Sequence, residues 1–335
     1  MRHSIALWCV AVITCCSSWA AAGAPFDWPA FDKLPASDRL DIVLAGMRQH
    51  EAALRNLQLK LKEDWTTFGP NGPFHATRSV LLRMKGLQYY CEWERRLGGE
   101  FDCKVRVCWD GQVCRLNSTR PSRPYPSGLV QQTETDDLQK IWFNDPLGIR
   151  REDSRRTVCD WLKTIINERQ IPYSVQSQRI EKRTFIQVST GGTETLDRDV
   201  YFIDPEHDFM IQRYQRFAAE NPKQIDRETV VEESRQVGGT FVPWRVRRPQ
   251  WINGKIYSQL DWEVESLSLE EPKDSELTLD FLPGTHVRDA IEETVYVLQK
   301  DGSRKYLPSF NPRTGRIKNV PNRGATASTQ PAKDK

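Results

Sequence analysis

Alternation of large apolar and charged residues over residues 260–266 is the feature that most restricts how this chain can fold. The stretch reads Leu-Asp-Trp-Glu-Val-Glu-Ser. Successive side chains of a β-strand point to opposite faces, so a period of two predicts a strand with one dry face and one wet face. A dry face has to be buried against other parts of the chain, so this strand cannot stand alone.

The same period recurs along the chain, which indicates that many strands share one apolar surface. The clearest further examples are Leu57/Leu59/Leu61, Leu87/Tyr89/Cys91/Trp93, Val105/Val107/Trp109 and Val242/Trp244/Val246. Between residues 174 and 269, strand-like segments are separated by short turns rich in Gly, Asn, Asp and Pro, which is typical of a meander. We therefore predict a mainly β protein with helices (α+β), built on a large antiparallel sheet that curves around the apolar surface.

The N-terminus has the order of a secretory signal peptide over residues 1–22. Arg2 and His3 precede an apolar run at residues 5–13, and three alanines stand at residues 20–22. The apolar run is much shorter than the roughly 20 residues that a membrane-spanning helix needs. Cys15 could belong to a lipoprotein signal, but the threonine before it fits such a signal poorly. We expect a periplasmic or otherwise extracytoplasmic protein.

Net charge is distributed unevenly. The chain carries +3 in total, and residues 301–335 hold eight Lys/Arg against two Asp. Because Arg2 leaves with the signal peptide, residues 23–300 carry a net −4. A mildly acidic body argues against nucleic acid as a partner. We expect the basic tail, residues 301–335, to be disordered, with attraction to an anionic membrane surface as an alternative role.

Two segments have helical periodicity. After an irregular lead-in at residues 23–37, Ser37 is a candidate cap for a helix with one apolar stripe. That stripe comprises Leu40, Val43, Leu44, Met47 and Leu54. A second helical pattern, at residues 136–167, predicts a helical insertion at about residues 128–170 that covers an apolar surface. We expect a single domain over residues 38–300.

Five cysteines remain after the signal peptide: Cys91, Cys103, Cys108, Cys114 and Cys159. Strand parity places the first, second and fourth of them on the apolar face. A loop centred on Leu97 would put Cys91 opposite Cys103, which makes these two a possible disulfide. Asp110-Gly111 predicts a two-residue type I′ hairpin turn. No C-x-x-C spacing and no nearby histidine pair is present, so we expect no metal site.

Catalytic signatures are missing from the sequence. Four histidines (His50, His75, His207 and His286) follow the signal peptide, and none belongs to an H-E-x-x-H motif or stands near a G-x-S-x-G motif. We expect them at the surface or in turns. Paired acids such as Glu263 and Glu265 belong to the wet face of a strand. The sequence predicts neither an enzyme nor a cofactor.

The order of elements resembles a known superfamily. An amphipathic helix runs directly into strands, a strand-Asp-Gly-strand unit spans residues 105–116, and residues 277–289 read Leu-Thr-Leu-Asp-Phe-Leu-Pro-Gly-Thr-His-Val-Arg-Asp. Over about residues 38–290, these features are similar to the periplasmic lipoprotein-carrier (LolA/LolB-like) superfamily, with its related sigma-factor regulator domain. The resemblance implies an unclosed, strongly curved antiparallel β-barrel with a helical lid, whose hollow binds acyl chains.

Two functions follow as expectations. The first is a non-enzymatic binding protein that holds a lipid, the acyl chain of an acylated protein or another hydrophobic ligand in the hollow, in lipid or lipoprotein trafficking. The expected lining is Leu59, Tyr89, Trp93, Val107, Trp109, Val242, Trp244, Leu260, Trp262 and Val264. The alternative is a regulatory module with a packed interior, whose partner is another periplasmic protein or a membrane surface.

Overall fold

The computed structural model describes residues 25–70, 72–132, 157–193, 196–311 and 316–318. In the first part of the chain, two helices precede six strands. They are α2 (Trp28–Asp32), α3 (Ala36–Ala53), β1 (Asn56–Gly69), β2 (Gly72–Lys85), β3 (Gln88–Leu97), β4 (Glu100–Trp109), β5 (Cys114–Thr119) and β6 (Ser127–Gln131).

The second part begins with a helical segment and continues as a meander. Its elements are α5 (Val158–Lys163), the π-helical turn η1 (Thr164–Glu168), β7 (Tyr173–Ile180), β8 (Arg183–Thr193), β9 (Leu196–Asp204), the short helix η2 (Pro205–His207), β10 (Met210–Phe217), β11 (Ile225–Val237), β12 (Thr240–Ile252) and β13 (Lys255–Ser268). The C-terminal part holds η3 (Asp274–Leu277), β14 (His286–Asp289), β15 (Thr294–Leu298), β16 (Arg304–Leu307), β17 (Ser309–Asn311) and β18 (Arg316–Lys318).

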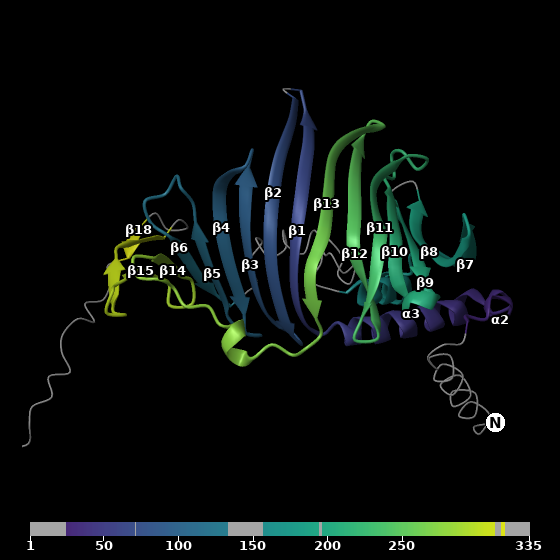
Figure 1. Ribbon diagram of the computed structural model, residues 1–335, viewed down its shortest axis with the longest axis horizontal. Coiled ribbons are helices and arrows are strands. Elements are labelled where there is room, and N and C mark those ends of the chain that lie inside the picture. Colours follow the sequence, from purple (N-terminus) through teal and green to yellow (C-terminus); the bar gives the residue numbers. More distant parts are fainter. Residues whose placement is uncertain (1–24, 71, 133–156, 194–195, 312–315, 319–335) are drawn as a thin grey trace, which may run out of the picture.

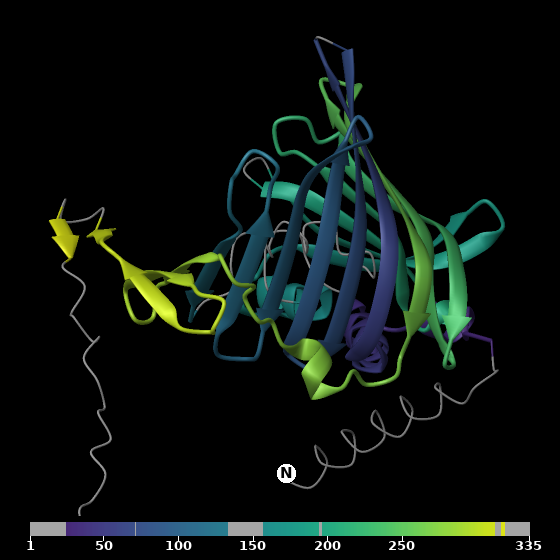
Figure 2. The ribbon, with the colours of Figure 1, turned by 60° about the vertical axis from the view of Figure 1, so that its left-hand side comes forward.

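Strands β1 to β16 form one curved, unclosed sheet (Figures 1 and 2). Its order is β16-β15-β14-β6-β5-β4-β3-β2-β1-β13-β12-β11-β10-β9-β8-β7. The fold class is the one that the sequence predicts, mainly β with an unclosed antiparallel half-barrel and a few helices. Its second meander runs from one edge back to the centre, where β13 pairs with β1.

The pairing of β1 with β13 places the two most regular alternating segments side by side. Leu61 lies opposite Val264, and Glu63 lies opposite Trp262. On the far side of β1, Leu61 lies opposite Val80 of β2. Because directly opposed residues share a face, the apolar face of each strand continues into that of its neighbour.

A strap of residues 269–285 crosses the convex face between β13 and β14. It is needed because β13 pairs with β1, whereas β14 pairs in parallel with β6, so β1 to β6 lie between the two strands that the strap connects. Leu277 and Leu279 of the strap pack with Tyr90 and Cys108 on the outer face of β3 and β4. This face is opposite to the one that the alternating apolar residues share, so those residues lie on the concave side.

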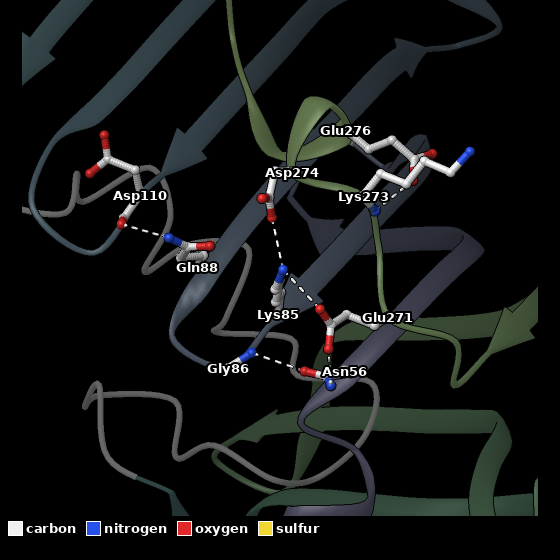
Figure 3. Close-up of polar contacts among 9 residues, drawn as sticks. All are labelled: Asn56, Lys85, Gly86, Gln88, Asp110, Glu271, Lys273, Asp274 and Glu276. Carbon is white, nitrogen blue, oxygen red and sulfur yellow. Dashed lines mark hydrogen bonds and ion pairs between the residues drawn. The ribbon is translucent and has the colours of Figure 1, made fainter.

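Polar contacts fix the strap to the lower rim of the sheet (Figure 3). Lys85 Nζ lies 2.8 Å from Asp274 Oδ1 and 2.8 Å from Glu271 Oε1. Asn56 Nδ2 donates to Glu271 Oε2 at 3.2 Å, and its Oδ1 accepts from the Gly86 amide at 3.1 Å. The start of β1, the β2–β3 turn and the strap are therefore joined at one point.

Helices cover the concave side of the second half of the sheet. Residues of α2, α3, α5 and η1 share one core with β7, β8 and β9, which includes Phe31, Val43, Leu162 and Ile186. The α5–η1 segment is the described helical part of the predicted insertion at about residues 128–170, whose first residues belong to strand β6 instead. Residues 133–156 of that insertion, like the predicted signal peptide, lie outside the described residues.

Several predicted boundaries are wrong. The lead-in contains α2, whose N-cap residue Asp27 accepts a hydrogen bond from the Ala30 amide. Helix α3 begins at Ala36, so Ser37 is inside it and makes no capping bond. The tail is not disordered throughout, because β16 pairs with β15, and β17 pairs with β18. Residues 312–315 and 319–335 lie outside the described residues.

The Asp110-Gly111 turn is also different from its prediction. Trp109 lies opposite Cys114, which leaves a four-residue loop in place of a two-residue turn. The Asp110 carboxylate accepts from the amides of Gln112 at 2.9 Å and Val113 at 2.7 Å, so its side chain organises the longer loop. The shift is two residues, so Cys114 keeps its predicted face.

Gly46 of α3 is a position where the fold tolerates no side chain. A Cβ atom there would lie 2.2 Å from Cγ of Phe209, whose own backbone has a φ of +58°. We expect Gly46→Ala to lower the free energy of unfolding by about 1–3 kcal/mol, because overpacking outweighs the better helix propensity of alanine. Urea unfolding measures this. Ala45→Gly, at an exposed position of the same helix, is the control and should cost about 1 kcal/mol. A stabilised Gly46→Ala variant would contradict this packing.

Candidate functional site

All ten residues predicted to line the hollow belong to one cluster on the concave face, which we call the inner surface. Seven of them are buried, and Trp93, Trp109 and Trp244 are partly buried against the rest. The buried members of the inner surface are Leu54, Leu57, Leu59, Leu61, Val80, Leu82, Met84, Tyr89, Cys91, Val105, Val107, Cys114, Leu116, Val242, Val246, Leu260, Trp262 and Val264.

Rows of opposed side chains cross the sheet and make up this surface. One row, from β1 to β5, consists of Leu59, Leu82, Cys91, Val107 and Leu116. The row above it, from β13 to β4, consists of Val264, Leu61, Val80, Trp93 and Val105. Each row is apolar from end to end, so the first half of the sheet offers a continuous hydrocarbon surface.

The inner surface differs from the helix-covered core in what lies against it. Every described member of its cluster comes from a strand or a strand-proximal loop except Leu54, which directly follows α3. In the other core, four helical segments supply much of the packing. Within the described ranges, therefore, the helical cover lies over β7 to β9 and not over β1 to β5.

A buried ion pair borders the inner surface on its upper side. Glu63 of β1 lies opposite both Arg78 of β2 and Trp262 of β13. Arg78 Nε donates to Glu63 Oε2 at 2.5 Å, and its guanidinium lies 5.4 Å from the centre of the Trp93 ring. Burial raises the pKa of the Glu63 carboxyl, and the positive charge of Arg78 opposes that rise.

Sequence reasoning missed this ion pair, although a signal was present. Glu63 continues the alternation of Leu57, Leu59 and Leu61, so its parity places an acid on the dry face. An acid there requires a partner, since an isolated buried charge is costly. Arg78 has the matching parity on β2.

Two indole N–H groups add unused hydrogen-bond donors beside the ion pair. Nε1 of Trp93 and Nε1 of Trp262 are buried, and neither has a hydrogen-bond partner among the described residues. A buried N–H group without a partner is costly, so binding of an oxygen acceptor there is favourable. The site thus combines a large hydrocarbon surface with a small polar group at one border.

The predicted Cys91–Cys103 disulfide is wrong. All five described cysteines are free, and Cys91 lies opposite Val107 whereas Cys103 lies opposite Arg95. The chain turns at Gly98 and Gly99, both with positive φ, and not around Leu97. As a result, the residue opposite each of these two cysteines is four positions away from the predicted one. Burial raises the pKa of Cys91 to about 12 and that of Cys103 to about 11, so neither thiol is ionised near neutral pH.

The four described histidines lie in different parts of the fold and do not form a cluster. His75 lies in β2, His207 in η2 with Nδ1 2.8 Å from Asp204 Oδ2, and His286 is stacked on Tyr125. His50 corrects the surface prediction, because it is buried in α3 and its two ring nitrogens have no hydrogen-bond partner among the described residues. Among those residues there is also no group of three or more His, Cys, Asp or Glu placed to hold a metal ion.

Glu263 and Glu265 lie on the wet face of β13, as predicted. Arg245 pairs with the first at 3.2 Å and Lys62 with the second at 3.0 Å. In the described ranges, no helix has the length and apolar character needed to cross a membrane.

Comparisons with known proteins give structural similarity only. No protein-family profile and no curated protein matches the sequence. A DUF1329 family protein from Desulfovibrio piger is similar with a TM-score of 0.45 and 10% identity, over 73% of this chain and 97% of that chain.

Two further solved structures are similar over much of this chain. The LolA superfamily protein NE2245 from Nitrosomonas europaea has a TM-score of 0.42 and 9% identity, over 72% of this chain and 99% of that chain. A putative outer membrane lipoprotein-sorting protein domain from Vibrio parahaemolyticus has a TM-score of 0.42 and 6% identity, over 71% and 97%.

Proposed function

We propose that this chain is a non-enzymatic extracytoplasmic binding protein that holds an acyl chain, of a lipid or an acylated protein, against the inner surface. The observation that carries the proposal is the continuous apolar face of β1 to β5 and β11 to β13, over which the described residues place no helix. The half-buried rings of Trp93, Trp109 and Trp244 are the members best placed to touch a ligand. A role in lipid or lipoprotein trafficking follows from such binding.

Hydrocarbon burial is sufficient for useful affinity. Removing a methylene group from water contributes about 0.8 kcal/mol, so about ten groups supply roughly 8 kcal/mol, equivalent to a dissociation constant of about 1 μM. No ionic or reactive group is required. The indole N–H groups of Trp93 and Trp262 would accommodate an ester or carboxyl oxygen at the polar border.

A packed interior is the second candidate, and one observation favours it. Leu59, Val107 and Val242 each have 0% exposure, which is also what a filled core would show. In that case the protein is a regulatory module that recognises another periplasmic protein through its outer face or a sheet edge. Lipid content separates the two candidates directly.

Lipid extraction and native mass spectrometry of the purified protein test the proposal. We expect a co-purifying acyl lipid, and displacement of a fluorescent fatty acid by unlabelled fatty acid. Trp109→Ala combined with Trp244→Ala should weaken binding of the probe at least tenfold, because both rings are partly exposed members of the inner surface.

Phe101→Ala is the matched control, since Phe101 is an exposed aromatic residue of β4 outside the cluster. It should bind the probe as the unaltered protein does. Absence of co-purifying lipid together with absence of probe binding would refute the acyl-chain proposal and support the packed interior.

A further inference from the structure

Two adjacent hairpins expose a group of large apolar side chains that the proposed function does not use. In the β1–β2 hairpin these are Trp65, Phe68 and Phe74, and in the β12–β13 hairpin they are Ile252, Ile256 and Tyr257. Each is between 44% and 54% exposed. We call these six residues the tip group.

The tip group is contiguous because the two hairpins are joined by hydrogen bonds. β1 pairs with β13 as far as Thr67 opposite Ser258, close to both turns. Figures 1 and 2 show the two tips projecting beyond the neighbouring strand ends on the same side of the sheet. The most protruding part of the sheet is therefore also apolar.

The sequence around the tips lacks acidic residues. Residues 65–76 and 249–260 contain no Asp or Glu, although the chain has 45 of them in 335 residues. Lys255 and His75 are the only side chains there that can carry a positive charge. An apolar tip without negative charge suits a surface of phospholipid headgroups, which are zwitterionic or anionic.

The directions of the side chains in the tip group favour a bilayer over a folded protein as its partner. Trp65 and Phe68 are three residues apart on one strand, so they point to opposite faces of the hairpin, as do the neighbours Ile256 and Tyr257. A folded partner would cover one face. A bilayer surrounds an inserted tip on all sides, and Trp and Tyr are the residues enriched at its interface.

We propose that the tip group inserts into the headgroup region of a phospholipid bilayer and docks the protein on a membrane surface. Insertion is shallow, because hairpin turns carry backbone groups that need water or headgroups as hydrogen-bond partners. The proposal is independent of whether the inner surface holds a ligand.

Flotation with vesicles tests the proposal. The mature chain, with its N-terminus determined by mass spectrometry, is mixed with phosphatidylcholine vesicles at high salt, which suppresses binding through the basic tail. We expect binding, and at least a tenfold lower partition coefficient for Phe68→Ser combined with Phe74→Ser. A second variant, Ile252→Ser combined with Ile256→Ser, should also have a lower partition coefficient. It provides the test if the first variant folds poorly.

Leu87→Ser is the control, because Leu87 is 73% exposed in the β2–β3 turn, at the opposite end of β2 from the tip. It should bind vesicles unchanged. Equal binding by both tip variants and the unaltered chain would overturn the proposal, as would no binding by the unaltered chain. The proposal would also be overturned if the unaltered chain does not bind vesicles and forms a dimer that both sets of tip substitutions dissociate. The tip group would then be a contact between two copies of this chain.

Discussion

Replacing Arg78 by methionine should lower the free energy of unfolding by about 3–5 kcal/mol at neutral pH. The change leaves the Glu63 carboxylate without its ion-pair partner, and removal of one partner of a buried pair costs about this much. Both side chains are well shielded, with 15% exposure for Arg78 and 6% for Glu63. Glu63→Leu should also be destabilising, because it leaves the shielded Arg78 guanidinium without its ion-pair partner.

The double variant, Glu63→Leu combined with Arg78→Met, distinguishes an ion pair from two independent residues. We expect it to be close to the unaltered protein in stability, because a well-packed apolar pair often equals a buried ion pair. Urea unfolding of the four proteins forms a double-mutant cycle. Additive losses in the double variant would contradict an energetic coupling between Glu63 and Arg78.

The pH dependence gives a second signature. Burial raises the pKa of Glu63 in the folded protein, so the carboxyl's stabilising contribution is complete below its unfolded pKa and is lost as pH rises through the folded pKa. Without Arg78, that folded pKa should rise further. Arg78→Met should therefore regain much of its lost stability on acidification, whereas the double variant should not show this recovery.

Local sequence patterns predicted the strands better than their partners. The period of two located the strands of the inner surface because burial on one face is a local property of each strand. The pairing of β13 with β1 joins segments that are far apart in the sequence, and no local pattern indicates it. Strand β14 has four residues, too short for a periodic pattern, and its parallel pairing with β6 depends on the strap that crosses the outer face.

Turn chemistry explains the errors in register. Gly98 and Gly99 form the β3–β4 turn, and placing it around Leu97 moved Cys91 away from its true partner, Val107. At the next hairpin, the Asp110 side chain binds two amides and lengthens the loop. Both errors shifted the register by an even number of residues, so Cys91 and Cys114 keep their predicted face while their cross-strand partners differ from the prediction.

Strand parity identified apolar members of the inner surface but not the ion pair at its border. All ten predicted lining residues have the parity of the inner surface and belong to its cluster, which also contains further apolar residues. The period of apolar residues does not identify Glu63, because a charged side chain interrupts that pattern and its partner Arg78 lies on another strand. His50 was overlooked in the same way, since it lies on the stripe of α3 between Met47 and Leu54.

Acidification should destabilise the protein through His50. Burial lowers the pKa of His50 from 6.5 to about 4, although the negative charge of Asp208 opposes this change. A folded pKa below the unfolded value means that the neutral ring is favoured by folding. The stability that His50 contributes is therefore complete above pH 6.5 and is lost as pH falls from 6.5 to about 4.

The expected loss over this range is about 3 kcal/mol, because each unit of pKa difference corresponds to about 1.4 kcal/mol. His50→Leu should remove this part of the pH dependence. It should also stabilise the protein at pH 7 by roughly 1–2 kcal/mol, since two buried ring nitrogens without partners among the described residues are replaced by methyl groups.

Urea unfolding at a series of pH values measures both effects, and His75→Gln is the control, because His75 is exposed on β2. The control should keep the pH dependence of the unaltered protein. NMR titration provides an independent check, in which the His50 ring should remain neutral down to about pH 4. A His50 pKa near 6.5, or equal pH profiles for the Leu variant and the unaltered protein, would contradict the buried neutral ring. Because Asp208 lies at the β9–β10 turn that packs on α3, Asp208→Asn should lower the His50 pKa further.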